Sequence, residues 1–567
     1  MKKKPKTGID RFDEYIQKSG LEPKNYQREG VEFCLRRELR SGGGGGAPIL
    51  GGIVADEMGL GKTIVMMGLI LANLAAFRRT LIVVPVALIA QWVAQIKKTI
   101  IDTGVKSDLT VFVYHGSTGK RRVILSDGGN GIVWCHRPPK RGGGGGGGAR
   151  AIDIVITTYG CVAMEEPTEK APKAAPKSAP KSDPKAPKTP TLSLLTFHAD
   201  RVIFDEAHHL RNKSSRVFKG AMRVVGRGVD GGRHPSVWIV TGTPIQNKIS
   251  DLKSLCYVLG FGVGDLITEE KRKMIRDQYV LRRTKVSVGM VAAAGAAVDD
   301  DVTCAPRLQS LAHYKSNVAW TSENELDLSR EIHRAAKNTS DRAERLKLYT
   351  RMRQMCVWPA LLRRGGGEDG GDDVTHGLSL DEFHVAVSKQ SKMDQVVDRM
   401  MAEDAGGGMG GCEGRKSIVF CHYRREMTQL RDMLLRSGVV AEEDDVAIID
   451  GTVGARERAR IFAAAPKVLI LQIRTCSEGL NLQEYSDVYF VSPHWNPCVE
   501  DQAIARCYRM GQTSQVRVFR FYMTDFVVEE RSGVVVAGES ECISTLDHKC
   551  EEIQERKRVL CNEFLLG

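Results

Sequence analysis

The stretch from Gly52 to Thr63, GIVADEMGLGKT, most narrowly limits what this chain can fold into. The apolar run from Ile49 to Ala55 predicts a short buried strand, and the apolar segment from Ile64 to Ala76 predicts a helix. A tight turn with two glycines lies between them. A strand, a glycine turn and a helix start in this order indicate a phosphate-binding loop, because backbone N–H groups and the helix dipole attract phosphate oxygens.

Two side chains at the end of this loop carry its expected chemistry. We expect Lys62 to reach the β- and γ-phosphates of ATP and the Thr63 hydroxyl to hold Mg²⁺. Asp56 stands where the strict pattern has glycine, and an ordinary glycine turn without a ligand is the alternative interpretation. The predicted nucleotide-binding residues of the loop are Asp56, Glu57, Met58, Gly59, Leu60, Gly61, Lys62 and Thr63.

Strand patterns alternate with helical patterns in two long regions of the chain. This alternation predicts an α/β fold, with parallel sheets flanked by helices, in two similar lobes joined by a helical connector. The strands are expected at residues 80–85, 109–114, 153–158, 201–204 and 236–241 in the first lobe, and at 417–421, 446–449, 468–473 and 487–491 in the second. The predicted domains are an N-terminal helical segment (1–48), lobe one (49–286), the connector (287–387), lobe two (388–530) and a helical tail (531–567).

Composition narrows the class of protein further. The formal net charge of +13 favours polyanionic partners, although a charge that serves only solubility is the alternative. The repeated Ala-Pro-Lys stretch, at about 164–190, is expected to be a disordered insertion, since it offers too little apolar surface to order. The 14 cysteines form no C-x-x-C pair, which predicts free thiols and no zinc module.

The sequence predicts neither a membrane span nor a secretory signal. The longest apolar stretch, from Ile64 to Phe77, is too short to cross a bilayer, so no membrane partner is expected. The basic run from Lys2 to Lys6 has no apolar segment behind it, which argues against a secretory signal. A nuclear import signal and a solvated, disordered end are the two interpretations of that run.

A second chemical feature follows the apolar residues Val202 to Phe204. Asp205 and Glu206 come directly after this predicted strand, at its carboxyl end, where open α/β sheets bind ligands. We expect Asp205 to bind Mg²⁺, through water, and Glu206 to act as the general base that activates the attacking water. A solvated acidic turn is the alternative, and the phosphate-binding loop upstream disfavours it.

With these residues in place, the chain resembles a known family. Asp205-Glu206-Ala207-His208 and the loop from Ala55 to Thr63 are similar to motifs of the Swi/Snf-related branch of the superfamily-two helicases, which commonly carries aspartate at position 56. The resemblance implies two RecA-like lobes and assigns Gln27 to reading the adenine base. It also implies that residues 85–92 and 153–159 contact the DNA backbone, and that residues 238–247 couple hydrolysis to lobe movement.

The resemblance extends into the second half of the chain. Leu281 to Lys285 resembles the end of lobe one, and Thr475 to Leu482 resembles a further motif in which Cys476 and Ser477 replace the usual glycines. His494-Trp495-Asn496-Pro497 is a specific match. The last motif, residues 500–512, contains Gln502, Arg506 and Arg509. A spacing of three would place both arginines on one helix face, where they would act as arginine fingers on ATP, with Gln502 also at the nucleotide.

This resemblance implies an ATP-dependent translocase on double-stranded DNA that remodels protein–DNA complexes in chromatin, DNA repair or transcription. The expected partners are the DNA backbone and DNA-bound proteins such as nucleosomes, polymerase or repair factors, in the nucleus or in a virus-infected cell. An RNA helicase, a catalytically inactive scaffold and a viral transcription or termination ATPase are the alternatives. The motifs lean toward the repair-associated branch, but Cys304 and Cys356 are too few for its RING finger, so neither zinc nor ubiquitin-ligase activity is expected.

Overall fold

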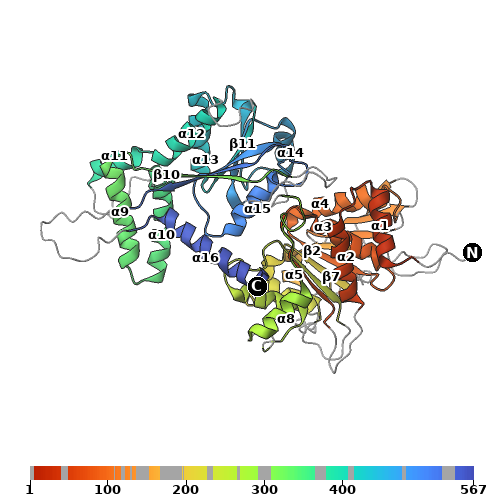
Figure 1. Cartoon of the computed structure of the whole chain (residues 1–567). Helices are drawn as coiled ribbons and strands as arrows, with labels where there is room; N and C mark the ends of the chain where they lie inside the picture. The colour runs from red at the N-terminus through yellow and green to blue at the C-terminus, as the bar shows by residue number, and fades with distance from the viewer. Residues whose placement is uncertain are drawn as a thin grey trace, which may run out of the picture. The chain divides into compact units, whose positions relative to one another are not determined.

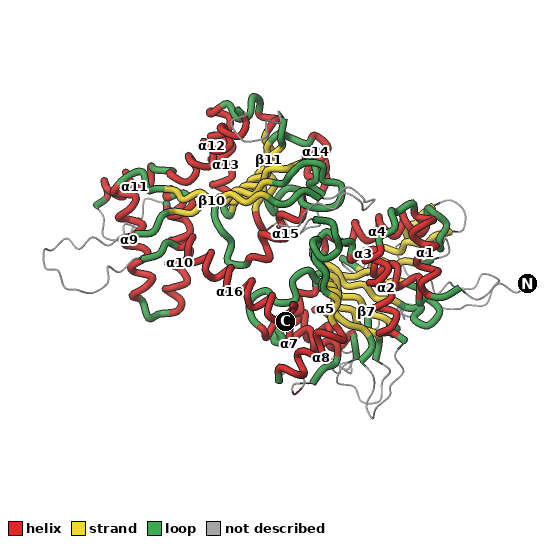
Figure 2. Tube along the Cα trace, viewed as in Figure 1, coloured by secondary structure: helices red, strands yellow, loops and turns green. Residues whose placement is uncertain are grey.

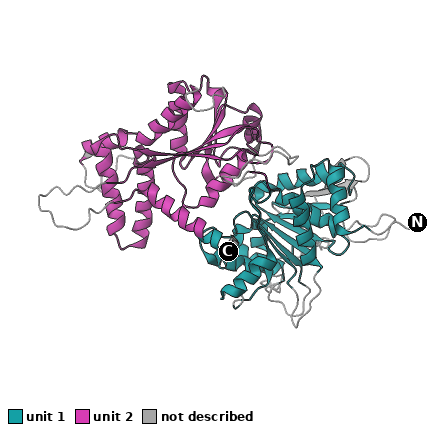
Figure 3. Ribbon diagram, in the orientation of Figure 1, with its two compact units in different colours: residues 1–288, 560–567 teal, residues 289–559 magenta. Residues whose placement is uncertain are grey.

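The chain forms two compact units, shown in Figure 3. Unit 1 comprises Met1–Val288 and Leu560–Gly567, and unit 2 comprises Gly289–Val559. A computed structural model describes residues 6–39, 49–106, 109–116, 122–127, 131–135, 152–165, 194–195, 197–226, 234–262, 264, 268–291, 308–363, 379–405, 414–474, 481–526 and 543–566. The predicted disordered insertion, apart from its first residues Met164 and Glu165, and the residues from Thr475 to Leu480, including Cys476 and Ser477, lie outside these ranges.

Within the described residues, unit 1 holds a nine-stranded sheet in the order β5-β4-β3-β6-β2-β7-β8-β1-β9. The strands from β3 to β9 in this order run parallel, as predicted, whereas β4 and β5 add an antiparallel ribbon at one edge that the sequence did not predict. Only a short connection separates β4 from β5, and such connections permit antiparallel pairing. The strands are β1 Gly51–Val54, β2 Thr80–Val84, β3 Val111–Tyr114, β4 Arg122–Asp127, β5 Gly131–Cys135, β6 Ile154–Thr158, β7 Arg201–Asp205, β8 Ser236–Val240 and β9 Val280–Leu281.

Helices cover both faces of this sheet (Figure 1). Side chains alternate along each strand, so Val237 and Ile239 pack in one apolar cluster while Trp238 and Val240 pack in the other. Both sets are fully buried, which explains the continuous apolar runs in the sequence. One face carries α1 Gly8–Ser19, α2 Asn25–Glu38, α3 Lys62–Ala72 and α4 Ile89–Ile96, and the other carries α5 Tyr159–Met164, α6 Arg216–Val224, α7 Ile249–Leu259 and α8 Glu269–Tyr279. Short helical turns are η1 Val86–Leu88, η2 Lys97–Ile101 and η3 Ala207–Leu210.

Unit 2 holds, in its described part, a six-stranded parallel sheet in the order β10-β15-β14-β11-β13-β12. The connector was predicted to be helical, and this is wrong at β10, Ala312–Val318, which pairs with β15. The strand lies at the sheet edge and most of its side chains reach solvent, so its sequence, AHYKSNV, lacks the apolar run of a buried strand. The strands are β10 Ala312–Val318, β11 Lys416–Cys421, β12 Val446–Ile449, β13 Val468–Gln472, β14 Tyr485–Phe490 and β15 Arg517–Met523.

Helices accompany the sheet of unit 2 (Figure 2). The buried apolar side chains of this unit form two clusters. Val419 and Cys421 of β11 pack in one cluster, and Ile418 and Phe420 pack in the other. No helix in the described ranges is long and apolar enough to cross a membrane. The helices are α9 Glu323–Asn338, α10 Arg342–Val357, α11 Leu380–Ser388, α12 Ser391–Asp404, α13 Arg424–Ser437, α14 Ala455–Ala464, α15 Pro497–Cys507 and α16 Leu546–Leu566, with short turns η5 Pro359–Leu362 and η6 Glu443–Asp445. The last turns of α16, from Leu560, belong to unit 1.

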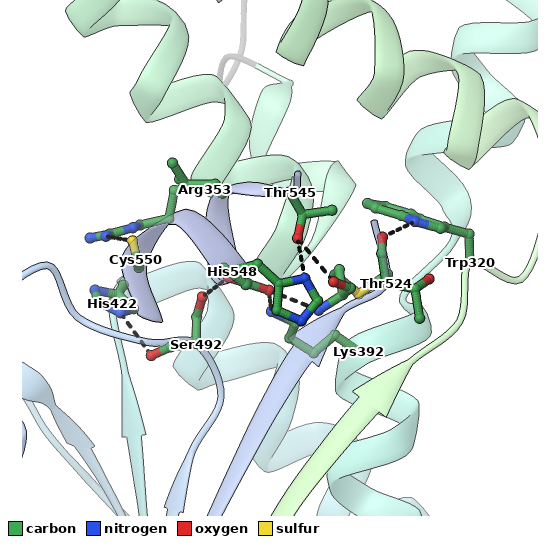
Figure 4. Close-up of polar contacts among 12 residues, drawn as sticks. Trp320, Arg353, Lys392, His422, Ser492, Thr524, Thr545, His548 and Cys550 are labelled. Carbon is green, nitrogen blue, oxygen red and sulfur yellow. Dashed lines mark hydrogen bonds and ion pairs between the residues drawn. The ribbon is translucent and has the colours of Figure 1, made fainter. Parts of the chain in front are cut away.

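The start of α16 is fastened into unit 2 by buried polar contacts (Figure 4). The carboxylate of Asp547 accepts hydrogen bonds from Ser492 Oγ (2.8 Å) and Met523 N (3.0 Å), and it pairs with the ammonium of Lys392. Asp547 and Lys392 are each 1% exposed. A buried pair of charges that also has hydrogen bonds fixes one arrangement, because any other leaves a charge without compensation.

His333 of α9 supports the same helix start, and its neutral form is required there. Its Nδ1–H donates to the Ser329 carbonyl (2.7 Å), and Nε2 accepts from Leu546 N (3.0 Å). Burial, with a smaller contribution from the charge of Lys549, lowers the pKa of His333 to about 4, although the hydrogen bond to Ser329 and the charges of Asp547 and Asp525 oppose this shift. Protonation at Nε2 would remove the acceptor for Leu546.

We therefore expect the stability of unit 2 to fall in acid. The folded-state pKa of His333 lies below the unfolded value of about 6.5. Its contribution is therefore present above pH 6.5 and is lost as the pH falls toward 4, with about 2 kcal/mol lost between pH 7 and pH 5. The variant His333→Gln keeps an acceptor but does not titrate. Urea unfolding at both pH values should show this extra loss in the wild type alone; equal losses in both proteins would contradict the prediction.

Candidate active site

The loop between β1 and α3 has the geometry of a phosphate-binding turn. Gly59 and Gly61 have φ of 91° and 79°, a region that favours glycine, and Gly61 is the N-cap of α3. A Cβ atom at Gly61 would lie 2.5 Å from Gln27 Nε2, so the turn has no room for a side chain there. Lys62 and Thr63 are the first residues of α3. The N–H groups at the start of a helix have no partners within it and can therefore bind phosphate oxygens.

Lys62 closes this loop on itself. Its Nζ donates to the carbonyl oxygens of Asp56 (2.8 Å) and Glu57 (3.3 Å). Burial lowers the pKa of Lys62, and the negative charges of Glu206, Asp56 and Asp205 oppose that shift. The fold therefore brings the lysine of the loop and the acidic pair after β7 into one electrostatic environment.

Asp205 and Glu206 lie at the carboxyl end of β7. Asp205 is the last residue of the strand and is 7% exposed, and burial followed by the charge of Glu206 raises its pKa. Glu206 has left-handed backbone angles, φ 50° and ψ 48°, and its N–H donates to Asp205 Oδ1 (3.0 Å). Such a backbone costs about 1–3 kcal/mol and is concentrated at functional sites. The His208 Nδ1 lies 3.4 Å from Glu206 Oε2.

Two aromatic side chains hold Asp205, and the sequence did not predict this. The indole Nε1–H of Trp92 donates to Asp205 Oδ2 (2.8 Å), and the Tyr159 hydroxyl donates to the Asp205 carbonyl (2.7 Å). Both were expected within segments that contact the DNA backbone, but Trp92 is 1% and Tyr159 is 5% exposed. These two side chains are therefore buried in unit 1, and a contact of either segment with DNA is left to its other residues. A carboxylate that follows a buried strand needs hydrogen-bond donors. This need could have pointed to a partner such as an indole N–H, although not to which one.

We expect Trp92→Phe to weaken Mg²⁺-dependent nucleotide binding about tenfold, the lower end of what loss of a partner behind a metal ligand costs. Phenylalanine fills the space but removes the donor to Asp205 Oδ2. The measurement is a Mg²⁺ titration of the binding of a fluorescent ADP analogue. Trp238→Phe is the matched control, since Trp238 is an equally buried indole that donates to Glu38 (3.0 Å). Equal effects of the two substitutions would refute the role of Trp92.

Two further residues that were predicted to bind the nucleotide, Gln27 and Asp56, make side-chain contacts within unit 1. Gln27 is 4% exposed and donates from Nε2 to the Leu60 carbonyl (3.2 Å), so it lies against the loop. The carboxylate of Asp56 is 1% exposed and is engaged by Arg283, with Nε to Oδ1 at 3.0 Å. Because the Asp56 carboxylate is held by Arg283, the backbone of Asp56 is the part of this residue that we expect to contact the nucleotide. Its negative charge is compensated within the protein.

The residues present suit a magnesium ion. Asp205 and Thr63 offer a carboxylate and a hydroxyl, and Mg²⁺ prefers oxygen donors, commonly one or two carboxylates together with substrate phosphates and waters. The Asp205 carboxylate is already oriented by Trp92 Nε1 and by Glu206 N. The donor set is sparse, as expected where phosphates complete the coordination.

The segment after β8 is tied to the segment after β7. Asp251 Oδ2 accepts from the backbone N–H groups of Gln246 (3.2 Å), Asn247 (2.8 Å) and Lys248 (3.2 Å). The Arg211 guanidinium donates to Gln246 Oε1. These contacts connect the coupling motif expected at 238–247 with the chain that follows the acidic pair.

In unit 2, the arginine motif is arranged differently from the prediction. α15 ends at Cys507, with Tyr508 as its C-cap, so Arg506 is helical and Arg509 lies beyond the helix. They therefore do not project from one helix face, although Arg506 is close enough for its charge, together with burial, to lower the pKa of Arg509. Gln502, within α15, is 5% exposed. Beyond the helix end, Gln512 Nε2 donates to the carbonyls of Gln483 (3.0 Å), Tyr485 (3.1 Å) and Cys507 (3.3 Å).

A glycine loop at a helix start, an acidic pair at the carboxyl end of another strand of the same parallel sheet and a second α/β unit define a helicase-like ATPase. Comparison with known proteins agrees. The SNF2-related domain family matches residues 26–266, and the helicase conserved C-terminal domain family matches residues 410–511. The chain belongs to the SNF2-related family of helicase-like, DNA-dependent ATPases.

Its relatives include viral and cellular proteins. A probable global transactivator of Orgyia pseudotsugata multicapsid polyhedrosis virus is 24% identical, over 90% of this chain and 87% of the viral protein. The DNA repair protein RAD5 of Gibberella zeae is 24% identical, over 90% of this chain and 56% of its own length. A human SWI/SNF-related matrix-associated actin-dependent regulator of chromatin, subfamily A member 1, is 24% identical over 85% of this chain and 40% of its own length.

The chain thus spans most of the viral relative but only about half or less of these cellular relatives. A solved structure, the SWI2/SNF2 ATPase core of Sulfolobus solfataricus in complex with dsDNA, is 20% identical and covers 88% of this chain and 87% of its own. The TM-score between the two structures is 0.33.

Proposed function

We propose that this chain is an ATP-driven motor that moves along double-stranded DNA and displaces or repositions proteins bound to it. The observation that carries the proposal is the convergence of the Lys62 loop and the Asp205–Glu206 pair at the carboxyl edge of one parallel sheet. Relatives named for chromatin regulation and DNA repair support DNA as the track. The nucleus, or an infected cell, is the corresponding location.

In this proposal, unit 1 binds ATP through the backbone of residues 56–61 and through Lys62. Thr63 and Asp205 hold Mg²⁺, which supplies charge neutralisation at the phosphates. Glu206 accepts the proton of the attacking water, and Trp92 keeps the Asp205 carboxylate oriented for its role. Lys62 exchanges its present acceptors, the Asp56 and Glu57 carbonyls, for phosphate oxygens.

Unit 2 contributes Arg506 and Arg509 to the same nucleotide in this mechanism, with Gln27 of unit 1 at the adenine and Gln502 beside the arginines. Guanidinium groups suit the charge that develops on a transferring phosphoryl group. A catalytic site completed by both units would make hydrolysis depend on their closure. The contacts between Arg211 and Gln246 would connect the acidic pair with the coupling motif during that movement.

A viral transcription ATPase is the second candidate. The match to the viral global transactivator spans 90% of this chain and 87% of the viral protein. The matches to the two cellular relatives span only 56% and 40% of those proteins. The motor would be the same, and its protein targets would be transcription complexes in place of nucleosomes or repair factors.

The test is ATP hydrolysis with duplex DNA, single-stranded DNA and RNA as activators, combined with displacement of a third strand from a triplex. We expect duplex DNA to stimulate hydrolysis most and the triplex strand to be released without separation of the duplex. Stronger stimulation by RNA would favour an RNA helicase. Absence of ATP turnover would favour a scaffold.

A further inference from the structure

Two carboxylates lie in the phosphate-binding loop, where negative charge would repel a triphosphate. Each is compensated by a cation from one short segment after β9. Asp56 pairs with Arg283, which donates from Nε to Oδ1 (3.0 Å) and from Nη2 to Oδ2. Glu57 pairs with Lys285, with Nζ and Oε1 3.1 Å apart. We call these four residues the exit clamp.

Backbone hydrogen bonds join the same two segments. Ala55 N donates to the Leu281 carbonyl (2.7 Å), and Glu57 N donates to the Arg283 carbonyl (2.8 Å). Lys285 N in turn donates to Glu57 Oε2 (2.8 Å). The parallel pairing of β1 with β9 therefore continues beyond both strands, so that the loop and the segment after β9 form one connected structure.

Arg283 also reaches the helix that carries Gln27. Its Nη1 donates to the Tyr26 carbonyl, and its guanidinium lies 5.5 Å from the centre of the Tyr26 ring. A Cβ atom at Gly30 would lie 2.9 Å from Nη2, so a larger residue there would have to shift the guanidinium. The Arg283 side chain is 12% exposed and that of Asp56 is 1% exposed. One buried cation thus connects the phosphate loop, the start of α2 and the segment after β9.

The segment after β9 that carries Arg283 and Lys285 is also the segment that leads from unit 1 into unit 2. The first stretch of unit 1 ends at Val288, just after Lys285, and the chain then enters unit 2 at Gly289. The residues that hold the phosphate loop are therefore the residues by which the chain leaves unit 1. A change in the loop acts on this exit directly, through the Asp56 and Glu57 ion pairs.

We propose that Arg283 is a positioning residue for ATP that acts through Asp56, and that the exit clamp transmits nucleotide binding to the segment from Arg282 to Val288. This rests on the proposed ATP site of unit 1. Asp56 thereby has a reason to replace glycine: its carboxylate anchors the loop to the exit and does not contact the nucleotide. Glu57 and Lys285 extend the same connection toward unit 2.

The test uses Asp56→Asn, Arg283→Gln, the double variant and Arg283→Lys in the full chain. Binding of a fluorescent ADP analogue with Mg²⁺ is measured together with hydrogen–deuterium exchange of residues 282–288. Each single substitution should weaken binding about tenfold, the loss expected for a hydrogen bond to a charged group. The double variant should bind no more weakly than the weaker single variant, because both remove one interaction. Arg283→Lys should recover part of the affinity.

In the wild type, Mg²⁺ and ADP should slow the exchange of residues 282–288, and Asp56→Asn should abolish that slowing. Glu38→Gln is the matched control, since it perturbs a buried ion pair of the same unit that does not contact the loop. It should keep nucleotide affinity within about twofold while lowering the melting temperature, because its effect is on folding alone.

Three results would overturn the proposal. Nucleotide affinity of Asp56→Asn or Arg283→Gln equal to the wild type would do so, as would equal loss in Glu38→Gln at a temperature where all variants are folded. If nucleotide binding left the hydrogen–deuterium exchange of residues 282–288 unchanged, the proposal that the exit clamp transmits binding to this segment would be wrong. A wild-type protein that binds no nucleotide would instead overturn the proposed ATP site itself, so the two failures are distinguishable.

Discussion

Glu206→Gln is expected to lower kcat for ATP hydrolysis about a thousandfold, within the range that positioned general bases contribute. Glutamine retains the size of the side chain and can still contact the attacking water, but it cannot take up its proton. The left-handed backbone of Glu206 and the bond from its N–H to Asp205 Oδ1 do not depend on the carboxylate. The variant should therefore fold and should bind ATP with an affinity close to that of the wild type.

The measurements are steady-state ATP turnover with saturating duplex DNA and equilibrium binding of a fluorescent ATP analogue. Glu165→Gln is the matched control, because Glu165 is a buried glutamate of unit 1 that accepts from the Tyr114 hydroxyl (3.0 Å) outside the site. It should leave kcat within about threefold, since it touches no reacting group. A Glu206→Gln protein with undiminished turnover would show that another group is the base.

Glu38→Ala is expected to destabilise unit 1 by about 3–5 kcal/mol, the usual loss when one partner of a buried ion pair is removed. Glu38, the last residue of α2, accepts from Arg201 Nε and Nη2, both at 2.6 Å. It also accepts from Trp238 Nε1 (3.0 Å), Ser236 Oγ (3.2 Å) and Asn73 Nδ2 (2.9 Å). Arg201 is 0% exposed, so the substitution leaves its positive charge buried without compensation.

Urea unfolding compared with that of Arg28→Gln measures this effect. Arg28 pairs on the surface with Glu32 (2.6 Å) and with Asp13 (3.1 Å), and the three side chains are 33–48% exposed. Such a surface pair contributes at most about 1 kcal/mol. Replacing Glu38 and Arg201 together with methionine should restore part of the stability, since no charge remains buried. Equal destabilisation by Glu38→Ala and Arg28→Gln would contradict the importance of the buried network.

The sequence predicted those residues of the proposed site that belong to a pattern of a few consecutive residues. The loop from Asp56 to Thr63 needs a strand, two glycines at positive φ and a helix start, and each leaves a mark in adjacent residues. Asp205 and Glu206 follow a run of buried residues, so their place at the carboxyl end of β7 was evident. Local rules failed at Arg509, because the residues around it carry no Gly or Pro stop signal at Cys507, where α15 ends.

The sequence by itself determined the α/β class, the parallel central strands, the loop of Lys62 and the acidic pair, since each depends on neighbours within a few residues. Only the tertiary structure decided what long-range pairing controls: β10 beside β15, Trp92 on Asp205, and Arg283 on Asp56. The side chains in these contacts are separated by up to hundreds of positions, and no local pattern records which buried donor will meet which carboxylate. Asp56 illustrates the division, because the sequence showed an unexpected charge in the loop and only the fold supplied its partner.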